Sequence, residues 1–486
     1  MVRNLSGRTT AQFISLWSLA ALAACASHPA PQLDYGRSDL YFGFILLDPE
    51  EERVRENSYL IVTDGRIAAI GEGDPPNRVF KSRRDFTGRY ALPGLVDAHA
   101  HVTAGPTTVE RVNGEPVLKM ESVDEITQYH ARVALAFGVT TVRNPAGDPA
   151  ANARYDERVR TGTWQGPDAV HAGAPVQPPP FGGNAFVYPR SEQEWHAEAQ
   201  RQADLGMRYL KLYVSLNDDE LAMGIRVAHQ HGLKAIAHLD AVSWTRALRL
   251  GIDGLTHALP TSADLLPAGS RAAYAAERGA DSRYMYRWFE LVDLDGPQIR
   301  ELIELLTKRQ TPIDLTLVVN RLIYNADNSD VMAPPAERRF VHPIVRQSAE
   351  RQMKASMTGW TPADYSRARA VMPKVLRFAA RLYQAGVPLM IGTDSYGGSP
   401  IYAHELQLHA DAGIPTWAVL RMATSEGARL LDLADETGRF RVGLQADFVF
   451  LNADPTRSLA NVTQVHTVVT NGAAYTFEEL VRAVID

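Results

Sequence analysis

Cysteine is almost absent from this chain, and so are long apolar runs and an excess of positive charge. The 486 residues include one cysteine, Cys25, so no disulfide can form within the chain. The formal net charge is −6, which gives no basic footprint for nucleic acid. The rest of the composition, 45% hydrophobic and 22% charged, is that of an ordinary globular protein. Its length allows one large domain and a smaller one.

The most pronounced apolar run is short and stands directly before the only cysteine. Residues 13–24 follow a basic start and are too few for a comfortable membrane span. The run ends in Leu22-Ala23-Ala24-Cys25, which resembles a bacterial lipobox, a motif in which the cysteine is lipidated. We therefore expect residues 1–24 to be a signal peptide of the lipoprotein type and residues 25–35 to be a tether.

Lipidation of Cys25 would anchor the protein in the bacterial cell envelope, on the periplasmic or outer-membrane side. The alternative is ordinary cleavage after Ala24 or Ala26, which would give a soluble periplasmic or secreted protein. Under either interpretation, residues 1–24 do not belong to the fold.

Both ends of the mature chain have strand-like sequences. Residues 59–62 and 67–71 are apolar runs on either side of Asp64-Gly65, which is a strong hairpin signal. Residues 446–451 and 465–470 have the same character near the C-terminus. We therefore expect one small β-sandwich domain built from residues 36–90 and 434–486.

Between these ends, strand-like and helix-like segments alternate. This rhythm favours an α/β fold with a parallel sheet, and eight such strands suit a (β/α)8 TIM barrel over residues 91–433. The long segments 262–290 and 322–360 are expected to be loop excursions at the top of the barrel. The eight expected strands contain Leu92, Val139, Ala169, Tyr209, Ala235, Gly254, Ile313 and Leu389.

His99 and His101 end the first of the expected barrel strands. Residues two apart in a strand face the same side, so both imidazoles can reach one ion. Imidazole is the commonest protein ligand for zinc and similar metals. The strand ends of a TIM barrel form its active face, and further polar side chains fall there. They are Lys211 in strand 4, His238 after strand 5, His257 after strand 6 and Asp394 after strand 8.

These residues stand in motifs that resemble the amidohydrolase superfamily of metal-dependent hydrolases. The family's first-strand motif is similar to LPGLVDAHAH at 92–101, and its eighth-strand motif to IGTDS at 391–395. The prolidase-like branch, which is related to imidazolonepropionases, resembles YLKLYV around Lys211 and GVTTVRN at 138–144. Further similar segments are the helical part at 404–433 and the returning strand at 438–455.

The resemblance implies two divalent metal ions, for which zinc is the expected metal. The implied ligands are His99, His101 and Asp394 for one ion, and His238 and His257 for the other, with Lys211 carboxylated by CO₂ as a bridge. Two metals would lower the pKa of a bridging water, and Asp394 would pass the proton of the resulting hydroxide to the leaving group. The expected substrate is a small amide, a dipeptide or an N-acyl amino acid, cleaved at its C–N bond.

Four side chains have structural alternatives. Asp394 either takes part in the chemistry or caps the helix or turn that follows it. Lys211 is flanked by apolar residues, where a charged amine is costly to bury, so it is either carboxylated or paired with a buried carboxylate. Tyr213 faces the same interior, and its hydroxyl either donates to the substrate carbonyl oxygen or belongs to a core aromatic. Arg143 either binds a substrate carboxylate or forms a structural ion pair. Asn144 stands where the branch carries an aspartate, which leaves any role carried over to this position in doubt.

Other functions remain open at this stage. A mononuclear deaminase would carry a glutamate three residues after the strand-5 histidine, where this chain has Ala241. A lactone, ester or phosphotriester hydrolase would use the same ligands. A non-catalytic binding lipoprotein would be expected to lose some of them. The expected partners are the small substrate and, through lipid, the membrane, with no nucleic acid; homo-oligomerisation stays open.

Overall fold

The computed structural model describes residues 33–485, apart from 113–114, 180–182, 278–281, 333 and 397–399. The expected signal peptide and the lipidation site Cys25 lie outside these described residues and stay predictions. Within the described part, no helix combines the length and the apolarity that a membrane crossing needs.

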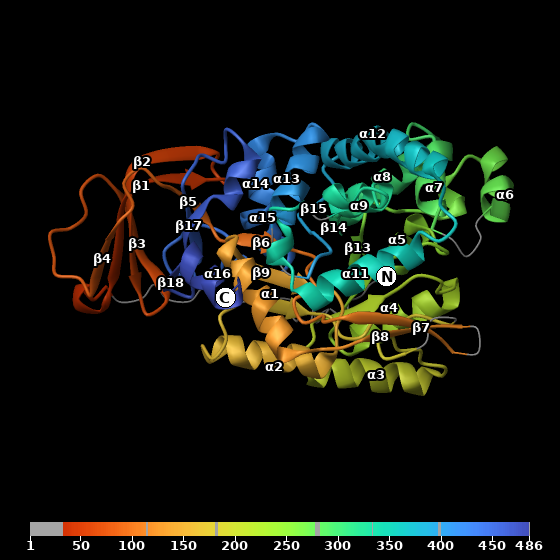
Figure 1. The fold of residues 1–486 in the computed structure, drawn as a ribbon, viewed down its shortest axis with the longest axis horizontal. Coiled ribbons are helices and arrows are strands. Elements are labelled where there is room, and N and C mark those ends of the chain that lie inside the picture. Colours follow the sequence, from red (N-terminus) through yellow and green to blue (C-terminus); the bar gives the residue numbers. More distant parts are fainter. Residues whose placement is uncertain are drawn as a thin grey trace, which may run out of the picture.

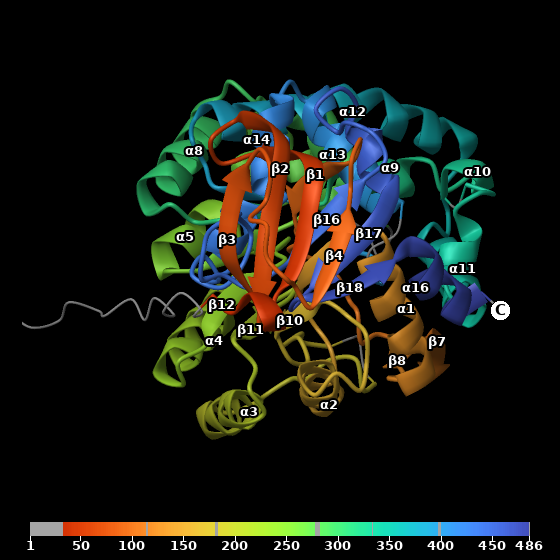
Figure 2. The ribbon, with the colours of Figure 1, turned by 90° about the vertical axis from the view of Figure 1, so that its left-hand side faces the viewer.

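Strands from both ends of the chain share one eight-stranded sheet, which faces the viewer in Figure 2. Its order is β18-β17-β16-β5-β1-β2-β3, and β4 pairs with β1. The antiparallel pair β16–β5 joins the two chain ends, and the β-sandwich expected here stays a prediction. The strands are β1 (Asp39–Asp48), β2 (Arg53–Thr63), β3 (Arg66–Glu72), β4 (Ser82–Asp85), β5 (Tyr90–Pro93), β16 (Phe448–Leu451), β17 (Val465–Thr470) and β18 (Ala473–Thr476).

Local sequence explains how this sheet turns and packs. Asp64 and Gly65 join β2 to β3 with positive φ values of 49° and 78°, as the tight hairpin turn predicted by this dipeptide requires. Tyr41, Phe86 and Phe450 form an aromatic cluster across the seam between the chain ends, with the rings of Phe86 and Phe450 stacked 3.6 Å apart. Apolar side chains contributed by both chain ends therefore stabilise the sheet.

The middle of the chain forms parallel strands followed by helices, which confirms the α/β class. One sheet has the order β10-β9-β6 and the other β11-β12-β13-β14-β15. Isolated parallel bridges, Ala172 with Tyr209 and Ala100 with Ser395, connect the two sheets at both edges. The strands are β6 (Leu95–Asp97), β9 (Val139–Asn144), β10 (Asp168–His171), β11 (Tyr209–Leu212), β12 (Lys234–Ala237), β13 (Gly254–Thr256), β14 (Ile313–Asp314) and β15 (Leu389–Met390).

One expected strand assignment is wrong, because Leu92 belongs to β5 of the other sheet and the first parallel strand is β6. Gly94 lies between them, where the chain passes from one sheet to the other. A Cβ at Gly94 would lie 2.0 Å from Oγ1 of Thr140, so only glycine permits this close crossing against β9.

Helices with one apolar face cover the parallel strands. The capping box of Asn217 and Glu220 begins α4, and Leu221, Ile225 and Ala228 then recur at helical spacing on its buried face. The covering helices are α1 (Asp124–Ala136), α2 (Pro149–Arg160), α3 (Glu192–Asp204), α4 (Asp218–Gln230), α5 (Trp244–Leu250), α8 (Pro297–Arg309), α12 (Pro362–Gln384), α13 (Ile401–Asp411), α14 (Thr416–Met422), α15 (Ser425–Leu430) and α16 (Phe477–Ile485).

The segments expected to be loop excursions are largely helical. Trp288 and Phe289 are fully buried on α7, and Pro343 begins α11 at a position that suits a proline. Figure 1 shows α6, α7 and the β7–β8 hairpin on the side of the molecule remote from the eight-stranded sheet. The hairpin consists of β7 (Thr107–Val112) and β8 (Glu115–Met120). The helices in or next to the two expected excursions are α6 (Ala268–Glu277), α7 (Tyr284–Leu291), α9 (Leu317–Tyr324), α10 (Ser329–Met332) and α11 (Pro343–Ser356).

A buried carboxylate lies where the eight-stranded sheet meets the parallel strands. Asp447 precedes β16 and is 3% exposed; it accepts hydrogen bonds from the backbone N–H of Asn471 (2.7 Å) and the hydroxyl of Thr437 (2.8 Å). Burial and the nearby Asp168 carboxylate raise the pKa of Asp447 to about 7. The folded protein therefore retains a proton at Asp447 that the unfolded chain releases near pH 4.

We predict that Asp447→Asn flattens the dependence of stability on pH. Because the native state binds the extra proton, the free energy of unfolding should fall as pH rises from about 4 to 7, with a slope of at most about 1.4 kcal/mol per pH unit. Asparagine cannot titrate, so the variant should lose this contribution. Urea unfolding between pH 4.5 and 7.5 measures the slope, and identical slopes in both proteins would contradict the assignment. The exposed Asp432→Asn is the control.

Candidate metal centre

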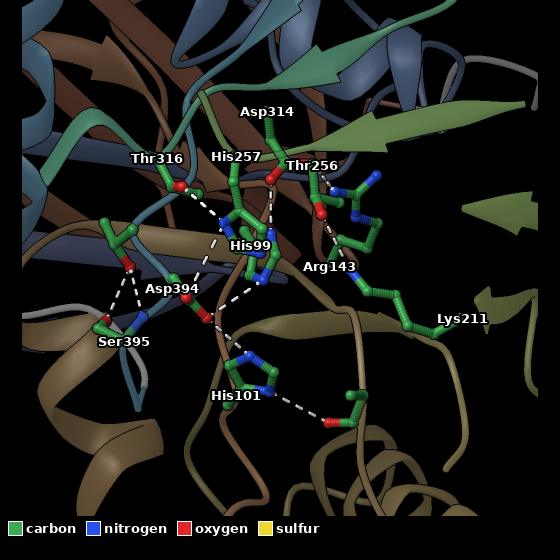
Figure 3. A network of polar contacts seen from close by, with 12 residues as sticks. His99, His101, Arg143, Lys211, Thr256, His257, Asp314, Thr316, Asp394 and Ser395 are labelled. Carbon is green, nitrogen blue, oxygen red and sulfur yellow. Dashed lines mark hydrogen bonds and ion pairs between the residues drawn. The ribbon is translucent and has the colours of Figure 1, made fainter. Parts of the chain in front are cut away.

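Three predicted ligand atoms converge at the ends of β6 and β15. The Nε2 atoms of His99 and His101 lie 3.2 Å and 2.9 Å from Oδ1 of Asp394 (Figure 3). The candidate ligand atoms of these residues all lie within 4.8 Å of one another. Two imidazoles and a carboxylate at this separation form a donor set that suits zinc or a similar ion.

Close packing between the two strand ends creates this convergence. A Cβ at Gly392 would lie 2.7 Å from Cβ of His99, so glycine at this position allows the chain after β15 to approach His99. Asp97 links the chain after β6 to the chain after β15. Its carboxylate accepts hydrogen bonds from the backbone N–H groups of His99 and Thr393, both at 3.1 Å, and from the Thr393 hydroxyl at 2.7 Å. Asp394 then adopts a φ of 52°, which a non-glycine residue takes only when its surroundings hold it there.

The second ring nitrogen of each histidine is held by an acceptor. Nδ1 of His99 lies 2.5 Å from Oδ1 of Asp314, and Nδ1 of His101 lies 3.3 Å from the carbonyl oxygen of Ala146. Such partners fix the orientation of a ligating imidazole and favour the tautomer whose Nε2 is free to bind metal. Both rings are therefore oriented as ligands.

His238 and His257 lie beside this set. The ring centroid of His257 lies 4.3 Å from that of His238 and 4.8 Å from that of His99. Nδ1 of His257 lies 2.8 Å from Oγ1 of Thr316 and 4.0 Å from Oδ2 of Asp394. Nδ1 of His238 is buried without a hydrogen-bond partner among the described residues, and burial lowers the pKa of His238 to about 4. Neutral imidazoles are the form that binds metal.

Lys211 reaches the same site from β11. Its side chain is 2% exposed and lines the cavity that also contains His99, His257 and Asp394. Nζ donates to Oγ1 of Thr256 at 3.0 Å, as Figure 3 shows. Burial, and to a smaller extent the Arg143 guanidinium, lowers the pKa of Lys211 to about 7 although Asp314 opposes the shift. The amine is therefore much more easily neutralised than a solvent-exposed lysine.

The carboxylates make the site favourable for positive charge. Burial opposes the charged form of Asp394, but His99 and His101 outweigh it and hold the pKa of that carboxyl well below its usual range. Burial likewise opposes the charged form of His99, yet Asp314 and Asp394 together raise its pKa. Buried carboxylates that stabilise a protonated imidazole also stabilise a metal cation at the same place. The residues at this site therefore fit the predicted metal.

The three remaining candidate residues have different surroundings. The guanidinium of Arg143 is 2% exposed and forms a buried ion pair with Asp314, which favours its structural alternative over substrate binding. Tyr213 lines the cavity, and its ring lies 5.0 Å from that of His238. Burial raises the pKa of Tyr213, so its hydroxyl stays a hydrogen-bond donor. Asn144 donates to Oγ1 of Thr103 at 2.9 Å and therefore supports the loop after β6.

Several residues that orient the ligands were not among the predicted site residues, chief among them Asp314. Asp314 is fully buried at the end of β14 and contacts both His99 and Arg143. It stands at a strand C-terminal end, so the rule that selected the other ligands could have found it. The end of the expected strand that contains Ile313 was not located at Asp314 in the sequence; the structure ends β14 at Asp314 and begins α9 at Leu317. Thr256 and Thr316 gave no sequence signal.

An α/β fold that gathers histidines and an aspartate at the ends of parallel strands defines a class of metal-dependent hydrolases. The sequence profile of the Amidohydrolase family matches residues 90–474, and the chain belongs to this family.

Known structures and sequences agree with this assignment. A Xaa-Pro dipeptidase has a TM-score of 0.64 and 18% identity, with 90% of this chain and 100% of that chain covered. A prolidase-like protein from Bifidobacterium longum has a TM-score of 0.63 and 18% identity, with 93% and 100% covered. At these identities the likeness concerns the fold. An imidazolonepropionase from Streptococcus gordonii is 32% identical over 78 residues, which span 15% of this chain and only 18% of that protein.

Proposed function

We propose that this protein is a metal-dependent amidohydrolase that cleaves the C–N bond of a small amide, a dipeptide or an N-acyl amino acid. The convergence of His99, His101 and Asp394 within 4.8 Å in a cavity is the observation that carries the proposal. The fold shared with a Xaa-Pro dipeptidase supports this substrate class. The bridges at both sheet edges support a further proposal, that the eight parallel strands close into a (β/α)8 barrel with the site at its strand ends.

The proposed metal ligands are His99, His101 and Asp394 for one ion and His238 and His257 for a second. When bound, divalent ions lower the pKa of water and polarise a carbonyl group. Asp394 accepts a proton from the attacking water and delivers it to the leaving nitrogen, so that a C–O bond forms as the C–N bond breaks. Tyr213 donates a hydrogen bond to the carbonyl oxygen as negative charge develops there.

Carboxylated Lys211 is the proposed bridge between the two ions. The neutral amine adds to CO₂ and releases one proton, which leaves an anionic carbamate whose oxygens can act as metal ligands. Burial of Lys211 among apolar neighbours supports this step, because it favours the neutral amine over the ammonium. The new carboxylate and Asp394 would together supply two negative charges, which offset half of the positive charge of two dications.

We predict that protein loaded with zinc and bicarbonate binds about two ions and hydrolyses members of a dipeptide and N-acyl amino acid panel. His101→Ala should lose metal and hydrolysis together, because it removes a ligand. The matched control is His229→Ala, since His229 pairs with Asp253 on the surface and lies outside the cavity lining. Inductively coupled plasma mass spectrometry measures the metal, and ninhydrin detects released amines.

Other outcomes separate the alternatives. One bound ion with release of ammonia would indicate a mononuclear deaminase. Two ions with turnover of lactones or phosphotriesters alone would indicate a different hydrolase on the same site. Absence of both metal and turnover would overturn the proposal in favour of a binding protein.

A further inference from the structure

The cavity that contains the candidate metal centre is much larger than the centre itself. Its volume is about 1420 Å³, whereas pockets for small-molecule ligands measure roughly 300–1,000 Å³. The polar residues His99, His101, Lys211, His257 and Asp394 account for part of the lining. An ordinary dipeptide or an acetylated amino acid would therefore leave much of the cavity unfilled.

Methionine is concentrated in the rest of the lining. The chain has 11 methionines, and five of them line this one cavity. Methionine is unbranched and polarisable, so surfaces rich in it adapt to apolar ligands of different shapes. The five are Met120 of β8, Met285 of α7, Met332 of α10, Met353 of α11, and Met357 directly after α11.

The neighbours of these methionines are apolar as well. Leu322 and Met353 are only partly buried by the protein, so both keep apolar surface available for a ligand. Other large apolar lining residues include Leu118, Phe186, Ile323, Phe340 and Tyr365. This apolar wall belongs mainly to the helices of 284–357 and to the β7–β8 hairpin. Figure 1 shows α7 and this hairpin on the side of the molecule remote from the eight-stranded sheet.

Three arginines that line the cavity pair with protein carboxylates. Arg346 lies 3.1 Å from Glu350, Arg201 lies 2.7 Å from Glu198, and Arg154 lies 3.7 Å from Asp124. These arginines are therefore partly neutralised before any substrate enters. Outside the metal centre, the cavity offers apolar contact more than charge.

We propose that the substrate carries a long apolar acyl chain, and that the methionine-rich wall binds this chain while the amide lies at the metal centre. This inference rests on the proposed amidohydrolase function and adds its substrate class, N-acyl amino acids with medium or long chains. Each buried methylene adds up to about fourfold in affinity. The gain accumulates along the chain until the acyl group fills the cavity.

The test compares N-acetyl-, N-hexanoyl- and N-decanoyl-L-alanine with the zinc-loaded full chain. We expect kcat/KM to rise at least about 100-fold from the acetyl to the decanoyl substrate, since eight more methylenes become buried. Met353→Trp should lower the ratio of decanoyl to acetyl turnover about tenfold, because the larger ring occupies part of the wall. Met372→Trp is the matched control: Met372 is also a partly buried helical methionine, but it packs against the core outside the lining and should leave the ratio unchanged.

The binding of decanoate and hexanoate, measured by calorimetry, separates this inference from the proposed function. Both acids present the same carboxylate, so any difference reports the chain alone. Turnover with no dependence on chain length would overturn the inference and leave the amidohydrolase function standing. Hydrolysis of dipeptides alone would likewise overturn the inference and leave the amidohydrolase function standing. If neither dipeptides nor N-acyl amino acids are hydrolysed, the proposed function fails. The cavity assignment then holds if decanoate binds about tenfold or more tighter than hexanoate, and fails if the two bind equally.

Discussion

Replacement of Lys211 by alanine should lower kcat/KM on the amide substrate by on the order of 100-fold or more. The change removes the only proposed ligand that touches both ions, and with it one of two compensating negative charges. Zinc-loaded Lys211→Ala should also retain fewer ions than the wild type. Steady-state kinetics and metal analysis on the same preparation measure both effects.

Two further measurements show whether the loss has this cause. Acetate or propionate should partly restore activity to Lys211→Ala, because a small carboxylate can fill the space of the missing group. The control variant is Lys234→Ala, since Lys234 begins β12 and pairs with Asp432 on the surface, where its loss should change neither quantity. Full metal content and near-normal turnover in Lys211→Ala would contradict the bridging role. An ion pair from Lys211 to a buried carboxylate would then be the better interpretation.

The parts of the site that could be predicted follow from one rule. Polar residues at the C-terminal ends of parallel strands meet at one face, whatever their separation in sequence. His99 and Asp394 are 295 positions apart, yet their strands are linked by the bridge from Ala100 to Ser395. Strand ends are visible in the sequence as apolar runs that stop at a polar residue, which is why these residues could be selected.

The parts that could not be predicted depend on tertiary contacts. The strand-end rule could have pointed to the position of Asp314, but its role depends on contacts with His99 and Arg143 that the sequence does not show. The choice between two roles for Arg143 likewise needed its neighbour. Leu92 was assigned to the wrong sheet because the crossing at Gly94 depends on contact with Thr140 and leaves no pattern in the sequence.

The two expected loop excursions show a second reason why the sequence did not predict the whole fold. Residues 262–290 and 322–360 were expected to be loops because they interrupt the strand–helix rhythm of the chain. Their helices instead bury aromatic residues such as Trp288, whose indole N–H donates to the carbonyl of Ser262 at 2.9 Å. The apolar residues of these segments, rather than their position outside the strand–helix alternation, indicated both the helices and the apolar cavity wall.

Asp394→Asn should lower turnover far more than it lowers metal content. The amide oxygen can still coordinate an ion weakly, but the side chain can no longer accept a proton. Loss of a general acid–base group typically costs about 10²- to 10⁴-fold in rate. Asp314→Asn is the matched comparison, since Asp314 orients His99 without reaching the reacting atoms and should reduce metal affinity more than the turnover of the metal-loaded protein.

The leaving group distinguishes proton transfer from a general loss of the site. In the proposed mechanism, Asp394 delivers a proton to the departing nitrogen, and an electron-poor anilide departs with little need of it. Asp394→Asn should therefore be impaired most on an alkyl amide and least on a 4-nitroanilide of the same acyl group. Metal content measured on each sample corrects for lost ions. Equal impairment on both substrates at equal metal content would mean that Asp394 acts only as a ligand, because a ligand's contribution does not depend on the basicity of the leaving amine.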